Sequence, residues 1–221
     1  MDMTPDRWRA TCAYLDDVFG TEDEQMRTLM TRAVAAGLPD IAVSASVGHL
    51  LMVLAKTAGA RTIVEVGTLG GYSGIWLARG LVPGGRLITI EAEPRHAAFA
   101  RAEFGRAGLG DRVEVREGKG LEVLPALVEE LGEGSVDLVF LDAIKTEYPG
   151  YLPHAKTLLR PGGLVTADNA LGGGWWIDDA PGSNESRDAA DRFNRLVAGD
   201  ADFDAACVPI REGVLIARKR G

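Results

Sequence analysis

The stretch Asp137-Leu-Val-Phe-Leu-Asp142-Ala-Ile-Lys145 decides the fold, because it delivers a carboxylate and then an amine directly after a buried strand. A run of apolar residues bounded by polar ones is typical of a strand covered on both faces, as in a parallel sheet. A second apolar run, Leu164 to Ala167, leads into Asp168 and Asn169 in the same way. Open α/β sheets bind ligands beyond the carboxyl ends of their strands, so these side chains mark a candidate site.

The same alternation of strand, turn and helix runs through the chain from residue 61 onward, which predicts a parallel sheet with helices on both faces. Two last strands are joined by a few residues and should therefore pair antiparallel at the sheet edge. The expected strands are 62–66, 86–91, 112–116, 136–141, 164–168, 203–208 and 213–217, and the expected helices are 72–79, 94–108, 120–131, 148–159 and 187–198.

Helical periodicity dominates the first 58 residues. Thr4 and Pro5 predict the start of one helix, which runs to Phe19. Thr21-Glu-Asp-Glu24 matches a capping box for a second helix, and Ser44 is the expected cap of a third. With no repeat or linker, we predict a single domain over 1–221, in which 1–58 form N-terminal helices and 59–221 the α/β core.

Composition excludes several classes of partner. The chain has 221 residues, 46% of them hydrophobic, and its formal charge of −8 argues against a nucleic-acid or anionic-membrane surface. Two cysteines are too few for a disulfide framework, and neither has metal-ligand spacing. Without an apolar run of membrane length or a basic signal-peptide start, the sequence predicts a cytoplasmic protein with no nucleic-acid or membrane partner.

The glycine-rich loop Gly67 to Gly71 follows the first strand of the predicted core, where a nucleotide is expected to bind. A dinucleotide fingerprint would need Gly-x-Gly-x-x-Gly, yet Leu69 and Tyr72 stand where the second and third glycines belong. Glu91 ends the next strand, where an acid can accept hydrogen bonds from both ribose hydroxyls. A structural turn and a solvated strand end are the alternative interpretations of these two features.

Four segments together resemble the metal-dependent catechol and caffeoyl-CoA O-methyltransferases: Glu65 to Ser73, the strand end at Glu91, Leu138 to Lys145, and Leu159 to Asn169. The similarity runs from about Ile41 to Lys219. It implies a Rossmann-like class I methyltransferase sheet, with strand order 3-2-1-4-5-7-6 and strand 7 antiparallel. It also implies S-adenosylmethionine as the methyl donor.

The resemblance further implies that Asp142, Asp168 and Asn169 bind a divalent metal and that Lys145 is the general base. Three hard oxygen donors without a nearby cysteine or histidine suit Mg²⁺ or another hard divalent cation. An Asx turn and a surface lysine are the structural alternatives. The residues implied for the donor are Val43, Glu65, Gly67, Ser73, Glu91, Gly118, Lys119 and Asp142.

The segment after the fifth strand departs from the family. Many relatives have Asp-Asn-x-Leu-Trp-x-Gly, whereas here Gly172 takes the place of the bulky ring and Trp175 and Trp176 follow. Adjacent tryptophans at the pocket mouth predict either an aromatic lid that contacts the substrate or an anchor that ties the loop to the core.

The leading hypothesis is a Mg²⁺-dependent O-methyltransferase that acts on a small metal-chelating acceptor, catechol-like or a natural-product intermediate. The main alternative acceptor is an α-hydroxyacyl (hydroxymalonyl-type) group on an acyl carrier protein. A tRNA-modifying enzyme is disfavoured by acidic residues in the loop region, and an NAD-dependent oxidoreductase by the glycine pattern. A non-catalytic nucleoside-binding protein would not need Lys145. Family habit and the amphipathic N-terminal helices predict a homodimer.

Overall fold

The computed structural model describes residues 4–172 and 180–221, and its centre is a sheet of seven strands within those residues. The strand order is β3-β2-β1-β4-β5-β7-β6, in which β7 pairs antiparallel with both of its neighbours and all other pairs are parallel. The predicted order is therefore confirmed. The strands are β1 (Thr62–Val66), β2 (Arg86–Glu91), β3 (Val113–Glu117), β4 (Val136–Leu141), β5 (Leu159–Ala167), β6 (Phe203–Val208) and β7 (Val214–Lys219).

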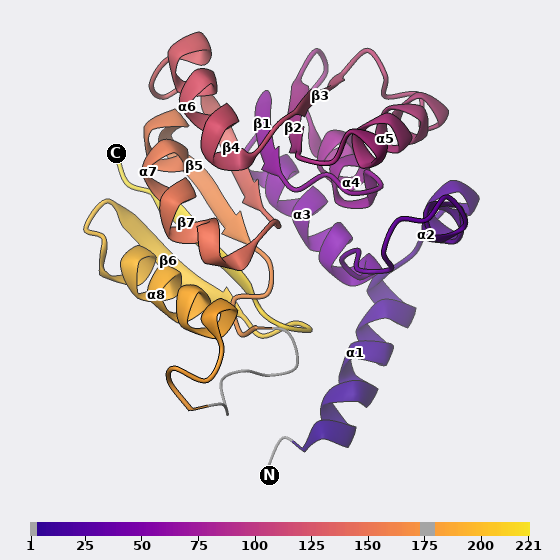
Figure 1. The fold of residues 1–221 in the computed structure, drawn as a ribbon, viewed down its shortest axis with the longest axis horizontal. Helices are drawn as coiled ribbons and strands as arrows, with labels where there is room; N and C mark the ends of the chain where they lie inside the picture. The colour runs from indigo at the N-terminus through magenta and orange to yellow at the C-terminus, as the bar shows by residue number, and fades with distance from the viewer. Residues whose placement is uncertain (1–3, 173–179) are drawn as a thin grey trace.

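Helices cover both faces of this sheet, as Figure 1 shows, with α3, α4 and α5 on one side and α6, α7 and α8 on the other. Each layer closes its own apolar core against the sheet. The helices are α1 (Pro5–Phe19), α2 (Glu24–Ala35), α3 (Ala45–Thr57), α4 (Tyr72–Gly80), α5 (Pro94–Arg106), α6 (Gly120–Leu131), α7 (Tyr148–Leu158) and α8 (Glu185–Gly199), and a short 3₁₀ turn, η1, spans Lys145–Glu147.

Strand β4 is central, and every one of its residues is buried. Leu138 and Phe140 enter the core under α3 to α5, whereas Val139 and Leu141 enter the opposite core. This explains the uninterrupted apolar run, because a strand with two covered faces has no solvent side to make polar. At its start, the Asp137 carboxylate accepts hydrogen bonds from the backbone N–H groups of Arg61 and Thr62, at 2.7 and 2.9 Å.

Two local predictions were wrong. Helix α2 is capped by Asp23, whose carboxylate accepts from the N–H of Met26 at 3.0 Å, and not by Thr21. Asp23 also pairs with Arg79, which favours this cap over the expected capping box. Strand β5 begins at Leu159 and not at residue 164, because it pairs with Val136 ahead of a register shift that precedes the regular ladder.

Helix α1 lies apart from the two layers and projects from the body of the molecule (Figure 1). None of its residues is buried, and the side chains of Tyr14 and Phe19 are 62% and 57% exposed. The helix therefore gains little from packing on this chain alone.

Within the described residues, no helix combines the length and the apolar composition that crossing a bilayer requires.

Candidate active site

A cavity of about 920 Å³ opens at the carboxyl ends of β1, β2, β4 and β5. Its size is near the upper end of the usual range for small-molecule sites, roughly 300–1,000 Å³, which leaves room for two ligands. Trp175 and Trp176 lie outside the described residues. Of the other predicted site residues, Glu65 does not line the cavity, and those that do are Val43, Gly67, Ser73, Glu91, Gly118, Lys119, Asp142, Lys145, Asp168 and Asn169.

The end of β4 fixes Asp142 and Lys145 relative to each other. The N–H of Asp142 donates to the carbonyl of Val66 at 2.8 Å, so the turn after β4 stays attached to β1. Lys145 opens the 3₁₀ turn, and its Nζ lies 2.9 Å from Oδ1 of Asp142. The same Nζ donates to the hydroxyl of Tyr148 at 2.7 Å. Both partners therefore hold the amine at the cavity wall.

Tyr148 was not predicted as a site residue, yet it joins the two strand ends. Its hydroxyl donates to the carbonyl of Leu141 at 2.9 Å and lies 3.4 Å from the carbonyl of Asp168. Burial, and then the charges of Asp142 and Asp168, raise its pKa well above the usual value. The phenol therefore stays protonated and serves as a fixed hydrogen-bonding partner of the lysine.

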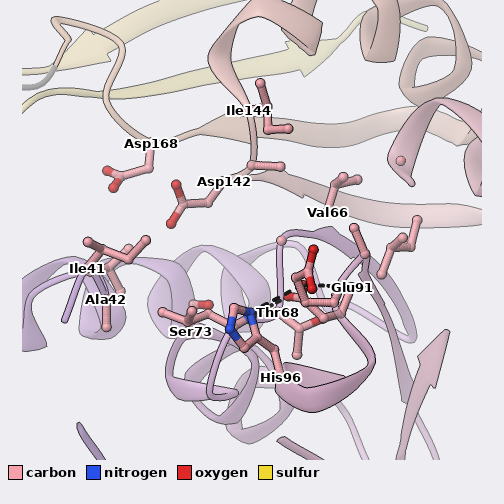
Figure 2. Close-up of a pocket in the computed structure, with 18 of the residues that line it drawn as sticks. Ile41, Ala42, Val66, Thr68, Ser73, Glu91, His96, Asp142, Ile144 and Asp168 are labelled. Carbon is pink, nitrogen blue, oxygen red and sulfur yellow. Dashed lines mark hydrogen bonds and ion pairs between the residues drawn. The ribbon is translucent and has the colours of Figure 1, made fainter. Parts of the chain in front are cut away.

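Asp168 ends β5 and is almost completely buried, with 4% of its surface exposed. Burial and the neighbouring charge of Asp142 raise its pKa to about 7, although the charge of Lys145 opposes the shift. Figure 2 shows the two carboxylates projecting into the same space from neighbouring strand ends. A second negative charge beside a buried carboxylate is costly, and a bound cation would relieve that cost.

Asn169 follows in the left-handed region, at φ +54°, which asparagine tolerates better than most residues. Its Nδ2 donates to the carboxylate of Glu212, in the turn between β6 and β7. The amide oxygen therefore points away from Glu212. The turn is also tied to this segment by backbone bonds from Ala170 to Gly213, 2.9 Å, and from Leu171 to Glu212, 2.7 Å.

The loop after β1 is supported from below by Glu65, which is fully buried. Its carboxylate accepts from the hydroxyls of Ser73 at 2.7 Å and Thr89 at 2.6 Å, and burial raises its pKa to about 7. The hydroxyl of Ser73 thus donates to Glu65, and no side-chain cap bonds the backbone N–H groups at the start of α4. Gly71 caps this helix without a side-chain bond, so its N-terminus is suited to an anionic group.

Glu91 lies in the part of the cavity away from Asp168 (Figure 2). One of its oxygens accepts from the N–H of Leu69 at 2.7 Å and the other from the N–H of Glu93 at 2.9 Å. A carboxylate has about four lone-pair sites, so both oxygens can accept further bonds. His96, not predicted, lies 3.6 Å from the same carboxylate, and no motif in the sequence had marked it.

Gly67 is where the first loop touches the end of β4. It adopts φ +102°, and a Cβ built there would lie 2.0 Å from the carbonyl oxygen of Asp142. We expect Gly67→Ala to destabilise the fold by about 3 kcal/mol or more, because both the strained conformation and the clash must be relieved. Urea unfolding measures this loss.

Gly84→Ala is the matched control for this substitution. Gly84 also has a positive φ, +75°, but a Cβ there would meet nothing within 4 Å. Its cost is therefore the backbone strain alone, about 1 kcal/mol. Equal unfolding midpoints for the two variants would contradict the claim that the contact with Asp142 matters.

A cation would need oxygen ligands at this site. Among residues 4–172 and 180–221, no group of three or more His, Cys, Asp and Glu side chains is placed to hold a metal. The predicted ligands, Asp142, Asp168 and Asn169, are not such a group, because the third of them offers an amide oxygen. All three line the cavity at the ends of β4 and β5.

Comparisons with known proteins agree with this geometry. A family model described as O-methyltransferase matches residues 16–220. The chain is 42% identical to the catechol O-methyltransferase of Niastella koreensis over 192 residues, which cover 87% of this chain and 86% of the relative. It is 40% identical to the catechol O-methyltransferase of Mycobacterium tuberculosis over 196 residues, 89% of this chain and 86% of the other.

Two solved structures superpose over nearly the whole chain. The O-methyltransferase of Bacillus cereus in complex with SAH has a TM-score of 0.89 and 36% identity, and the match covers 97% of this chain and 99% of that one. TomG of Streptomyces achromogenes, involved in tomaymycin synthesis and solved with SAM, has a TM-score of 0.87 and 37% identity over the full length of both chains.

Proposed function

As this chain belongs to the O-methyltransferase family and is an S-adenosylmethionine-dependent enzyme, we propose that it requires Mg²⁺ or another hard divalent cation and methylates a catechol-like acceptor. The acceptor is a small molecule whose two neighbouring oxygens chelate the cation. One observation carries this proposal: the buried carboxylate of Asp168 shares the cavity with Asp142 and its partner Lys145. The names of the two catechol O-methyltransferase relatives favour the same acceptor.

The proposed cation ligands are Asp142, Asp168 and Asn169. The hydrogen bond from Asn169 to Glu212 occupies the amide nitrogen, so the oxygen is the atom left for a cation. Lys145 occupies one oxygen of Asp142, and the other makes no hydrogen bond to the residues that the structure describes. Hard oxygen donors of this kind suit Mg²⁺. When bound, such a cation lowers the pKa of a chelating hydroxyl and orients it.

Lys145 is the proposed general base. Its amine would accept the proton of the acceptor hydroxyl, and S-adenosylmethionine would supply the methyl group to that oxygen and leave as S-adenosylhomocysteine. Hydrogen bonds to Asp142 and Tyr148 fix where Nζ lies, which is what a base needs to reach one particular proton. The 3₁₀ turn delivers the lysine back toward the strand end.

The proposed donor site occupies the other part of the cavity. In this proposal Glu91 accepts hydrogen bonds from the ribose hydroxyls of S-adenosylmethionine, and the Gly67 loop lies along its methionine part. The carboxylate of the donor meets Val43 and the first turn of α4 at Ser73, which Glu65 supports from below. Gly118 and Lys119, at the start of α6, flank the adenine, and Asp142 also faces the ammonium group of the donor.

Transfer of labelled methyl groups with and without EDTA tests this function. We expect methylation of 3,4-dihydroxy aromatics, its loss in EDTA, and its recovery when Mg²⁺ is added in excess. Methylation that is insensitive to EDTA would refute the cation. A parallel assay uses an α-hydroxyacyl carrier-protein thioester, and label on that substrate alone would replace the catechol with the polyketide acceptor.

We also propose that residues 1–221 act as one domain and that two copies associate through α1. The exposed Tyr14, Val18 and Phe19 on that helix form an apolar face that a second copy would cover. Light scattering coupled to size exclusion is expected to give the mass of a dimer, and Phe19→Asp the mass of a monomer. A monomeric wild-type protein would contradict the proposal.

A further inference from the structure

Arg211 lies in the turn between β6 and β7, on the wall of the cavity next to Asn169 and Glu212. Its backbone is in the left-handed region, at φ +47°. A residue with a long side chain seldom adopts this conformation, which glycine adopts freely. Strained positions of this kind cluster at ligand-binding sites, so the side chain itself is the feature to explain.

The guanidinium of Arg211 is largely available to a ligand. Its one hydrogen bond within the described residues goes from Nη1 to the carbonyl of Ala42, at 3.2 Å. No carboxylate among residues 4–172 and 180–221 forms an ion pair with it within 4.0 Å. Most of its N–H donors therefore lack a protein acceptor in the part of the chain that the structure describes.

The other basic groups of the cavity are engaged or lie elsewhere. Lys145 is held by Asp142 and Tyr148, and His96 lies beside Glu91. Lys119 is the residue that precedes α6, at the proposed adenine end. Arg211 is instead near enough to Asp168 for its charge to act on that carboxylate. On the side where the acceptor would bind, Lys145 is paired with Asp142, whereas Arg211 has no ion pair within the described residues.

The rest of the cavity wall would repel an anionic acceptor. Its acidic side chains are Asp40, Glu91, Glu93, Asp142, Glu147, Asp168 and Glu212. An acceptor that carries a negative charge needs a positive partner in such a place. Arginine is well suited to this because its planar fork can donate two parallel bonds to one carboxylate.

We infer that Arg211 binds a carboxylate of the methyl acceptor, so that the preferred acceptor is an acid with its carboxylate on the side of the β6–β7 turn. This inference rests on the proposed function and specifies its substrate class. The carboxylate of S-adenosylmethionine is the other source of the same chemistry. The start of α4, where Gly71 makes no side-chain cap bond, is already the proposed place of the donor carboxylate. Glu91, proposed for the donor ribose, lies away from Asp168 (Figure 2), whereas the charge of Arg211 acts on Asp168. Both observations favour the acceptor carboxylate as the partner of Arg211.

The test compares 3,4-dihydroxybenzoate with its neutral analogue 3,4-dihydroxybenzamide. The wild type is expected to prefer the acid in kcat/KM by about 10- to 100-fold, which is the worth of one hydrogen-bonded charge pair. Arg211→Gln is expected to bring this ratio close to one, and Arg211→Lys to leave an intermediate ratio. Thermal unfolding of each variant verifies that it is folded.

Arg195→Gln is the control, because Arg195 is exposed on α8 and pairs with Asp191. It should keep the wild-type ratio. A ratio near one in the wild type, or a ratio unchanged in Arg211→Gln, would overturn the inference. So would a tenfold weaker affinity of Arg211→Gln for S-adenosylmethionine in calorimetry, because the arginine would then serve the donor.

A separate arm distinguishes failure of the inference from failure of the proposed function. If the wild type methylates neither compound, the catechol acceptor is wrong. Calorimetry of both compounds in the presence of S-adenosylhomocysteine and Mg²⁺ then decides the role of Arg211. Tighter binding of the acid, lost in Arg211→Gln, supports that role, whereas equal binding of acid and amide refutes it.

Discussion

Replacing Lys145 with methionine is expected to lower kcat for methyl transfer by about 10²- to 10⁴-fold, the usual contribution of a general base. The affinity for S-adenosylmethionine should stay within about twofold, because all proposed donor contacts except Asp142 lie away from Lys145, on β1, β2, α4, α6 and the segment before α3. Methionine keeps most of the length of lysine and removes the amine. Single-turnover transfer to 3,4-dihydroxybenzoate and calorimetry with the donor measure the two quantities.

Lys56→Met is the matched control, since Lys56 is exposed near the end of α3. It removes the same charge and leaves the site untouched. A Lys145 variant that turns over at the wild-type rate would remove the base from the mechanism. Equal losses in both variants would point to net charge and not to proton transfer.

Replacing Asp168 with asparagine is expected to stabilise the metal-free protein while abolishing cation-dependent turnover. The carboxylate is buried beside Asp142, and its pKa in the folded state is about 7, above the value near 3.9 of an unfolded chain. The stability that this group contributes is therefore fully present below about pH 4. It is lost as the pH rises through about 7, because the unfolded chain releases its proton first.

Asparagine has no proton to release and removes this loss. In EDTA above pH 7, the free energy of unfolding of the variant should exceed that of the wild type by on the order of 2–4 kcal/mol. Near pH 4 the two values should differ little. Thermal unfolding between pH 4 and 8.5 measures the difference, and binding of Mn²⁺ followed by electron paramagnetic resonance measures the loss of the cation.

Glu65 titrates with the same sign, because burial also raises its pKa to about 7. The Asp168 variant should therefore flatten the pH dependence of stability only in part, and adding Glu65→Gln should flatten it further. Asp111→Asn, at an exposed position, is the control for removing one charge. An Asp168 variant that is less stable than the wild type in EDTA at pH 8 would contradict the assignment.

The family resemblance implied the strand order, and the location of the site followed from the sequence because each of these strand ends carries its own local motif. Gly67, Glu91, Asp142 and Asp168 each follow an apolar run, and a parallel sheet brings such ends to one edge. The topology of a parallel sheet alone predicts that these ends converge on one cavity, without knowledge of any contact between distant residues. The antiparallel pairing of β6 and β7 was predicted separately, from the short connection between the two strands.

What the sequence did not predict depends on contacts between distant segments. Glu212 meets Asn169 from 43 residues away, and Arg211 meets Ala42 from 169 residues away. Arg211-Glu-Gly213 looks like an ordinary hairpin turn until the fold places it beside β5. Tyr148 was assigned to a helix by periodicity, and nothing local indicated that its hydroxyl would join two strand ends.

The contact between Gly67 and the carbonyl of Asp142 bears on how such an enzyme can diversify. The loop after β1, proposed for the donor half of the cavity, and the end of β4, proposed for the acceptor half, meet there through main-chain atoms. The alignment of the two halves is thus independent of most side chains that line either one. With the role proposed for Arg211, substitutions in the β6–β7 turn would consequently redirect the choice of acceptor over evolutionary time while the line of methyl transfer stays in place.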